Sequence, residues 1–404
     1  MKLKERQKYA LTLPPSDGNG CVTVVRGVHR SGKTSLLKFH VCRDVDISTE
    51  ADGRLVYGCG SDGDTNVLAL DVGLAGNYHL RDVGILSGFV KGRIEDGKHN
   101  VVLIDGIEHV KGWEPFATDL ARGGADIYVT GPIPPTGGDR SLEVFTLTFR
   151  ECLDFAREYH GRFDMAYVFD RFIRIGGFPD MWRGDTDQSE VVSRAKGILS
   201  SCIVSDVEGV NVVKDTDFLL RLLYYISARI GNYTSLLDLV SAASSDDGAV
   251  KRSSVNAYVS YLEDASIIHR CETMDIRGGR VLPSKCRFYL ADVAFIDAVR
   301  GYISEEDTYE RLLNIIYLEL RSRGYSVYTG DYGGHTIDFV GEKDGRRIYV
   351  QLSDGDSDRK ATAMKRVRDG FPRFMVMMGT KGTTVSADGS NVMSPMDFLS
   401  SDVY

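Results

Sequence analysis

The sequence predicts an α/β protein built on a parallel sheet, and two features of its first 150 residues predict it. Short apolar runs alternate with helical or loop segments, which is typical of a parallel sheet covered on both faces. These runs are Val22–Val25, Arg54–Tyr57, Val101–Ile104 and Asp126–Thr130. In addition, the first run leads into a glycine-rich loop and then into Ser35–Phe39, which has the pattern of a helix start.

Composition excludes several classes of protein. The chain has 404 residues, 43% of them hydrophobic and 26% charged, as expected for a globular protein of about two to four domains. A net charge of −8 argues against a general polyanion binder. The seven cysteines form no C-x-x-C pair, which favours reduced thiols. Neither a signal peptide nor an apolar run of about 18 residues is found, so the sequence predicts a cytoplasmic protein without a membrane contact.

The loop after the first apolar run carries the pattern G-x-x-x-x-G-K-[ST], from Gly27 to Thr34. Its glycines let backbone N–H groups curl around an anion, and the helix N-terminus that follows adds partial positive charge. Lys33 is expected to reach the β- and γ-phosphates of a nucleotide and the Thr34 hydroxyl to bind Mg²⁺; an ordinary glycine-rich turn is the alternative. The residues expected at the nucleotide are Gly27, His29, Arg30, Ser31, Gly32, Lys33, Thr34, Ser35 and, from a later strand, Thr130.

A candidate metal and catalytic position ends the run Val101–Ile104. Asp105 follows it, and a carboxylate at the end of a buried strand beside a phosphate loop can hold Mg²⁺, although a turn residue is the alternative. ATPases that activate water usually place Glu directly after this Asp, where this chain has Gly106. Glu108 could act as the general base only if the backbone turned it inward. Thr130 offers a hydroxyl for sensing the γ-phosphate or simply ends its strand. The catalytic candidates are therefore Lys33, Asp105 and Glu108, with Thr34 and Asp105 as metal ligands.

Several phrases in this order resemble the bacterial and archaeal AAA-type P-loop ATPases that carry a further C-terminal domain. They are Gly27–Thr34, Leu103–Glu108, Gly112–Glu114, Val129–Gly131, Leu147–Glu151 and Arg174–Pro179. The resemblance covers residues 20 to 400 and implies ATP rather than GTP, a helical lid, a winged helix and a further α/β domain. Gly106 departs from the family's Asp-Glu pair. Arg150 matches a family position near the nucleotide end of the sheet, where we expect a structural salt bridge.

The resemblance and the element pattern together divide the chain into four parts. We expect the ATPase domain at 1–150, a helical lid at 151–206, a winged helix at 207–290 and the C-terminal domain at 291–404. The candidate recognition helix carries Lys251, Arg252, Ser253, Asn256 and Tyr258. Residues 206–290 hold ten Lys and Arg against eleven Asp and Glu, which favours weak DNA binding. A protein contact is the alternative use of a winged helix.

The C-terminal part resembles the restriction-endonuclease-like fold. A helix over Tyr309–Ser322 precedes three strand-like runs, with Asp338 on the second and Gln351 on the third. Nucleases of that fold also need a lysine, here replaced by Ser353, and an acid on the helix, where Leu313 stands. We therefore expect a degenerate nuclease domain.

Together these features predict an ATP-binding, Mg²⁺-dependent switch of AAA type with slow or absent hydrolysis. An ATP-gated DNA-binding protein or nuclease is one alternative, and a non-catalytic module that binds a protein partner is another.

Overall fold

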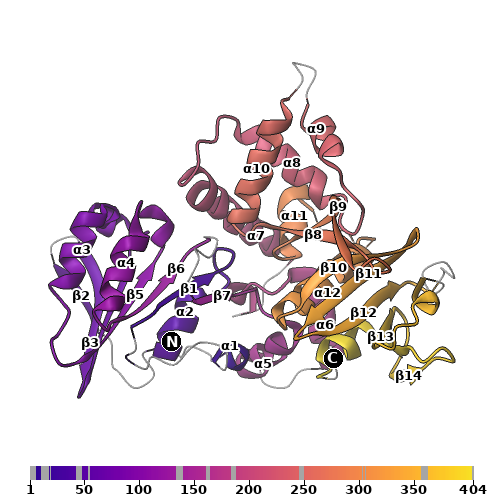
Figure 1. Cartoon of the computed structure of the whole chain (residues 1–404), viewed down its shortest axis with the longest axis horizontal. Helices are drawn as coiled ribbons and strands as arrows, with labels where there is room; N and C mark the ends of the chain where they lie inside the picture. The colour runs from indigo at the N-terminus through magenta and orange to yellow at the C-terminus, as the bar shows by residue number, and fades with distance from the viewer. Residues whose placement is uncertain are drawn as a thin grey trace. The chain divides into compact units, whose positions relative to one another are not determined.

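The computed structural model describes residues 6–10, 18, 20–41, 48–52, 55–132, 140–160, 164–182, 188–244, 250–302, 304, 306–355 and 363–402. The chain forms two compact units (Figure 1). The first comprises Met1–Val144 and Ser201–Val212, and the second comprises Phe145–Ser200 and Val213–Tyr404.

The first unit is an α/β sheet domain. Its elements are α1 (Gln7–Ala10), β1 (Val22–Arg26), α2 (Lys33–Val41), β2 (Ser48–Asp52), β3 (Leu55–Asp62), β4 (Thr65–Asp71), η1 (Ala75–Arg81), α3 (Val83–Lys91), β5 (His99–Asp105), η2 (Ile107–His109), α4 (Trp113–Arg122), β6 (Asp126–Thr130), β7 (Arg140–Glu143) and, from later in the chain, η4 (Ile203–Glu208). The sheet order is β2-β3-β4-β5-β6-β1-β7, and β4 to β7 in this order are parallel. The predicted parallel sheet is confirmed for β4 to β7. The predicted run Arg54–Tyr57, of which Arg54 lies outside the described residues, coincides with the start of β3, which pairs antiparallel with β2 and β4. The strand β4 was not predicted, although it is as buried as β5.

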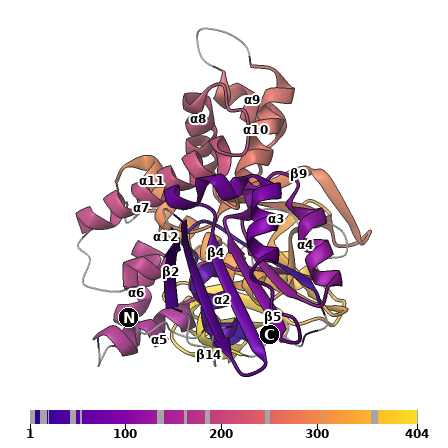
Figure 2. The same cartoon turned by 90° about the vertical axis from the view of Figure 1, so that its left-hand side faces the viewer.

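Residues alternate along β4 and β5 between two buried layers, as a sheet covered on both faces requires. One layer packs with α3 and α4 and contains Leu68, Leu70, Val102 and Ile104. The other packs with α2 and contains Val67, Ala69, Val101 and Leu103. Figure 2 shows the strands of this sheet with these helices beside them.

The strand register aligns three polar side chains at one edge of the sheet. Asp71 at the end of β4 is opposite Asp105 at the end of β5, and Asp105 is opposite Thr130 at the end of β6. Ligands of open α/β sheets bind at this carboxyl edge, so the register assembles a candidate site.

The second unit joins helices to a mixed sheet. Its elements are α5 (Phe149–His160), α6 (Met165–Ile175), η3 (Pro179–Trp182), most of α7 (Gln188–Cys202), α8 (Thr216–Ser227), α9 (Leu236–Ala243), α10 (Arg252–Asp264), β8 (Ile268–Asp275), β9 (Arg280–Leu290), α11 (Ala294–Arg300), α12 (Thr308–Ser322), β10 (Ser326–Tyr332), β11 (His335–Lys343), β12 (Arg346–Ser353), β13 (Arg373–Met377), β14 (Thr383–Val385), β15 (Asn391–Met393) and α14 (Pro395–Ser400). The expected C-terminal helix and three strands are present as α12 and β10–β12. The sheet order is β14-β15-β13-β12-β11-β10-β8-β9.

The hairpin β8–β9, which lies within the stretch expected to form a winged helix, belongs to this sheet because β8 pairs with β10 in parallel. Buried aromatic rings hold α12 on the sheet: Tyr317 stacks on Tyr289 with centroids 4.4 Å apart, and Tyr289 lies 5.7 Å from Phe339. The four-part division of the chain stays a prediction.

Candidate functional site

The glycine-rich loop contains three residues with positive φ angles, a conformation that anion-binding nests use. Gly27, Arg30 and Gly32 have positive φ angles of 143°, 62° and 97°. A Cβ on Gly27 would lie 2.1 Å from the carbonyl oxygen of Val144, so only glycine fits there. Arg30 is exposed and holds a left-handed conformation that costs a non-glycine residue about 1 kcal/mol or more. Such strain concentrates at functional sites.

Lys33 begins α2 and points back into the loop. Its Nζ donates to the carbonyl oxygens of Gly27 at 2.8 Å and of Val28 at 3.0 Å, and the side chain is buried. The ammonium group is therefore held inside the cradle, where phosphate oxygens could replace the carbonyl acceptors. Ser35 follows on α2 and is partly buried.

Arg6, which the sequence patterns did not single out, supports the loop from outside. Its Nη1 donates to the carbonyl oxygen of Ser31 at 3.0 Å, and Arg6 also lies over the ring of buried Tyr9. The hydroxyl oxygen of Ser31 is buried and has no hydrogen-bond partner among the described residues. An unsatisfied hydroxyl inside a phosphate loop suits a ligand that brings acceptor oxygens.

Asp105 binds the two threonine hydroxyls predicted for the site. Thr34 donates to its Oδ2 and Thr130 donates to its Oδ1. The structure thus brings Thr34, Asp105 and Thr130 together at the carboxyl edge. Mg²⁺ is usually held by one or two protein oxygens together with phosphates and water, so a hydroxyl and a carboxylate at this place fit it.

Gly106 is required by the backbone after Asp105. Its φ is 76°, and a Cβ would lie 3.3 Å from the backbone nitrogen of Gly73. A glutamate at this position would be strained whatever chemistry it offered. The backbone conformation at position 106 therefore explains why this chain has glycine where water-activating ATPases usually have glutamate.

Glu108 is turned inward by η2. Its side chain is 6% exposed, and Oε2, which faces Gly131, has no hydrogen-bond partner among the described residues. Burial raises the pKa of Glu108 to about 8, with Asp206 and Asp105 adding to the rise and Lys33 opposing it. Burial and Asp105 also raise the pKa of Asp71, a carboxylate that the motifs missed.

A segment remote in sequence acts electrostatically on residues of the site. Asp206 of η4 is buried, and its charge acts on His29 and on Glu108. Burial lowers the pKa of His29 while Asp206 raises it. The thiol of Cys202 is buried with its pKa raised, and a backbone hydrogen bond from His29 acts on it. No sequence signal marks this segment, because it reaches the loop by tertiary packing.

In the second unit, the candidate nuclease residues are used in structural contacts. Oδ1 of Asp338 accepts from Arg287 at 3.1 Å, and Oδ2 accepts from the Gln351 amide and from the backbone nitrogen of Leu352 at 3.2 Å. All four residues are buried. Asn314, beside the helical position expected for the acid, bonds both backbone groups of Leu290.

Two further candidate residues also have structural partners. The hydroxyl of Tyr258 is tied to the start of α8, where it accepts from the backbone nitrogens of Lys214 and Asp215, both at 3.0 Å. Tyr258 is buried and therefore not placed to contact DNA. Arg150 forms an ion pair with Asp402, as expected of a structural residue.

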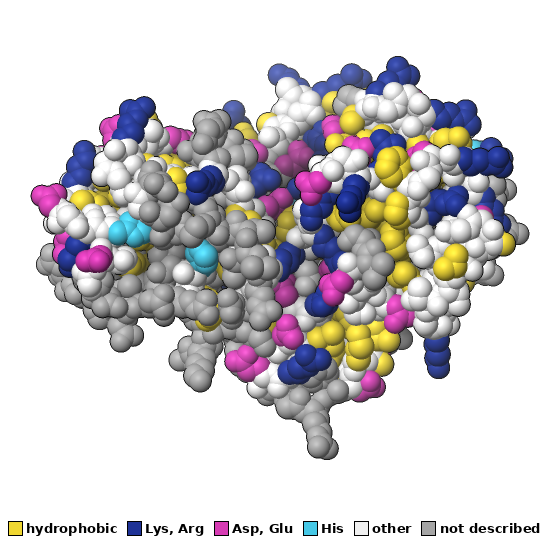
Figure 3. Space-filling view, turned by 60° about the horizontal axis from the view of Figure 1, so that its bottom comes forward, with side chains coloured by type: hydrophobic (Ala, Val, Ile, Leu, Met, Phe, Trp, Pro, Cys, Tyr) yellow, Lys and Arg dark blue, Asp and Glu magenta, His cyan; other side chains and the backbone are white. Residues whose placement is uncertain are grey.

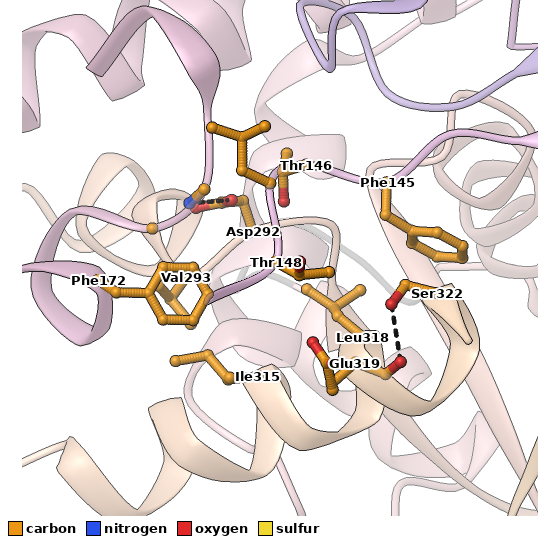
Figure 4. Close-up of a pocket in the computed structure, with 13 residues that line it drawn as sticks. Phe145, Thr146, Thr148, Phe172, Asp292, Val293, Ile315, Leu318, Glu319 and Ser322 are labelled. Carbon is orange, nitrogen blue, oxygen red and sulfur yellow. Dashed lines mark hydrogen bonds between the residues drawn. The ribbon is translucent and has the colours of Figure 1, made fainter. Parts of the chain in front are cut away.

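The Gly176-Gly177 phrase lines a small pocket of the second unit (Figure 4). A Cβ on Gly176 would lie 1.7 Å from Oδ1 of Asp292, and one on Gly177 would lie 2.2 Å from the Leu147 carbonyl oxygen. Asp292 accepts from the Gly177 nitrogen at 2.8 Å, and burial raises its pKa to about 6. The phrase is therefore explained by close packing between segments.

The surface carries charges of both signs. On the face drawn in Figure 3, Lys and Arg side chains lie interspersed with Asp and Glu and with apolar patches. Among the described residues, no helix has the length and apolar character needed to cross a bilayer.

Comparison with solved structures defines the class of fold. A Walker-type ATPase of Pyrococcus abyssi matches 74% of this chain and 96% of its own, with a TM-score of 0.50 and 11% identity. The fold is therefore that of a Walker-type ATPase.

The two relatives in sequence are both described only as uncharacterized proteins. An uncharacterized protein of Haemophilus influenzae is 22% identical over 409 residues, 98% of each chain. An uncharacterized protein of Methanocaldococcus jannaschii is 22% identical over 85% of this chain and 78% of its own. A family described as a domain of unknown function, DUF8612, matches residues 167–306, which include η4 and none of the glycine-rich loop.

Proposed function

We propose that this chain is an Mg²⁺-dependent ATP-binding protein of AAA type, in which the nucleotide acts as a switch and hydrolysis is slow or absent. One observation carries the proposal. Lys33 points into the glycine-rich loop, and the Thr34 hydroxyl is bonded to Asp105 at the carboxyl edge of the sheet. ATP, rather than another nucleotide, follows from the resemblance to AAA-type ATPases. The nucleotide contacts would come from the loop Gly27–Thr34, Ser35 and Thr130.

Each residue has a role in this proposal. Lys33 exchanges its carbonyl partners for β- and γ-phosphate oxygens, and the backbone N–H groups of the loop bind the remaining oxygens. Thr34 and Asp105 would hold Mg²⁺, which when bound neutralises phosphate charge. Thr130, already bonded to Asp105, reports the γ-phosphate to the end of β6.

Slow hydrolysis is supported by the residues at the two positions where a general base could stand, 106 and 108. Gly106 has no side chain, and the raised pKa of Glu108 keeps its carboxyl mainly protonated at neutral pH. A protonated carboxyl cannot take a proton from water, so any turnover through Glu108 is weak near pH 7.

Mg²⁺-ATP binding and steady-state phosphate release, measured in parallel, test the proposal. Wild type should bind, and Lys33→Ala should lose binding. Lys38→Ala, which removes an exposed lysine from the same helix, is the matched control and should bind as wild type does. A wild type that binds no nucleotide, or an unaffected Lys33→Ala, would refute the proposal.

The remaining parts of the proposal concern the second unit. The helices α5–α7 are consistent with the proposed helical lid. The helices α8–α10, followed by the hairpin β8–β9, are consistent with the proposed winged helix. The α12 helix before antiparallel β10–β12 supports a degenerate endonuclease-like domain. The nuclease alternative is disfavoured by the Arg287–Asp338 ion pair, and metal-dependent DNA cleavage that disappears in Asp338→Ala would support it.

A further inference from the structure

Asp71 lies on the same face of the sheet as the candidate metal ligand Asp105. The two residues are opposite each other in the parallel pairing of β4 with β5, and residues at opposite positions of neighbouring strands point to the same face. Along β4, Val67 and Ala69 belong to the layer that packs with α2, and the alternation of the strand puts Asp71 on that face as well. Because α2 begins in the phosphate loop, Asp71 extends the candidate site to a further strand.

Hydrogen bonds fix the turn that follows Asp71. Its Oδ1 accepts from the backbone nitrogen of Gly73 at 2.9 Å, and its carbonyl oxygen accepts from the buried amide of Asn77 at 2.8 Å. Nε of Arg81 donates to the carbonyl oxygen of Val72 at 3.1 Å. The carboxylate is thus held at the carboxyl edge of the sheet, and Asp71 is partly exposed, so a solvated ion can reach it.

The hydrogen bonds to these two neighbouring carboxylates come from neutral groups. Asp105 accepts from the hydroxyls of Thr34 and Thr130, and Asp71 accepts from a backbone N–H. Burial raises the pKa of Asp71, and the charge of Asp105 adds to the rise while Lys38 opposes it. The two carboxylates therefore repel each other, and a divalent cation bound beside both would remove that repulsion. Carboxylate and hydroxyl oxygens suit Mg²⁺, which is bound through one or two carboxylates and keeps several waters.

The phosphate loop beside these carboxylates gives an independent indication of a ligand. The Ser31 side chain is buried, and its Oγ has no hydrogen-bond partner among the described residues. This oxygen faces Gly27 across the loop, where a Cβ would lie 3.4 Å from it. Phosphate oxygens would satisfy the hydroxyl. Because Thr34 of the same loop is bonded to Asp105, a phosphate in the loop and a cation at Asp71 and Asp105 would belong to one site.

We propose that Asp71 is the second carboxylate of the magnesium site, where it accepts a hydrogen bond from a metal-bound water. The inference rests on the proposed nucleotide binding and deepens it by naming a residue that Mg²⁺ needs in addition to Thr34 and Asp105. Mg²⁺ gives up its waters reluctantly, so a carboxylate one strand away from Asp105 suits a bound water better than the ion itself. Such outer partners typically account for a factor of about 10–100 in metal affinity. The alternative is that Asp71 only stabilises the turn at Gly73, and metal affinity would then be independent of its charge.

The test measures how Mg²⁺ changes ATP affinity in the full chain for wild type, Asp71→Asn and the control Asp64→Asn. Asp71→Asn removes the charge and keeps an oxygen that can accept from the Gly73 nitrogen. Asp64→Asn makes the same charge change at an exposed residue directly before β4, at the opposite edge of the sheet. Titration calorimetry gives the dissociation constant for ATP in EDTA and at a series of free Mg²⁺ concentrations. The value in EDTA shows whether the phosphate loop of each variant is intact.

We expect Asp71→Asn to need about tenfold more free Mg²⁺ than wild type to reach half of the gain in ATP affinity that the metal gives. In EDTA it should bind ATP at least as tightly as wild type, because a negative charge near the phosphates has been removed. Asp64→Asn should stay within about twofold of wild type in both measurements.

Two results for Asp71→Asn would overturn this inference alone, provided that wild type binds ATP and responds to Mg²⁺. One is an unchanged Mg²⁺ dependence, and the other is weaker ATP binding in EDTA, because the residue would then act on the turn or the loop rather than on the metal. A wild type that binds no ATP would overturn the proposed function together with the inference. A wild type whose ATP affinity does not respond to Mg²⁺ would overturn the magnesium site of that function and the inference with it.

Discussion

The replacement of Glu108 by Gln gives the sharpest test of the electrostatics of the site. The two side chains have the same shape, and the amide cannot ionise. In the folded protein Glu108 is buried beside Gly131, with Asp206 and Asp105 disfavouring its charge. The variant should therefore be the more stable protein at neutral pH.

The size of the effect follows from the pKa. Folding raises the pKa of Glu108 from 4.5 to about 8, so the folded state holds the proton more tightly than the unfolded state. The resulting stability is fully present below pH 4.5 and is lost as the pH rises toward 8. At about 1.4 kcal/mol per pH unit, wild type loses about 3 kcal/mol relative to Glu108→Gln between pH 4.5 and pH 7.

Urea unfolding of the first unit at several pH values measures this difference. Trp113, buried in the core of that unit, reports its unfolding when both proteins carry Trp182→Phe. Glu95→Gln, at a side chain 47% exposed, is the control and should stay within about 0.5 kcal/mol of wild type. A stability difference between Glu108→Gln and wild type that stays constant from pH 5 to pH 8 would refute the reasoning.

Three further substitutions test the packing and the other candidate sites. Gly106→Glu should not raise phosphate release and should destabilise the first unit by about 1–3 kcal/mol, since φ at 106 is 76°; a faster ATPase would contradict this. Gly176→Ala should lower the free energy of unfolding of the second unit in urea by about 1–3 kcal/mol, because its Cβ would lie 1.7 Å from Oδ1 of Asp292; an unchanged free energy of unfolding would count against that contact. Asp338→Ala should cost about 3–5 kcal/mol by leaving buried Arg287 unpaired; a variant of wild-type stability would show that the ion pair is not structural.

Features carried by neighbouring residues could be predicted from the sequence. The phosphate loop, the strand that ends at Asp105 and the helix over Tyr309–Ser322 each depend on local spacing, and each is present in the structure. The comparison with water-activating ATPases also indicated that Gly106 was unusual. A glycine is favoured there because the backbone of Gly73 approaches it closely, which residue spacing does not reveal.

Residues that reach the site through packing could not be predicted. Arg6 lies 25 positions from Ser31, whose carbonyl oxygen it binds, and Asp206 lies in η4, the turn that follows α7. Asp71 ends a strand that was not predicted, and only the register with β5 makes it a neighbour of Asp105. A single carboxylate or arginine belongs to no local motif. The sequence around it therefore does not show whether it lies at a site or on the surface.

A nucleotide can switch this protein only through contacts that differ between ATP and ADP, and those contacts must be felt outside the sheet. Under the proposed function, Thr130 at the end of β6 and Glu108 in η2 would respond to a γ-phosphate inside the first unit. The segment Ser201–Val212 differs, because it belongs to the first unit while the chain on both sides of it belongs to the second. A nucleotide-dependent change in this segment would therefore reach the second unit along the chain itself.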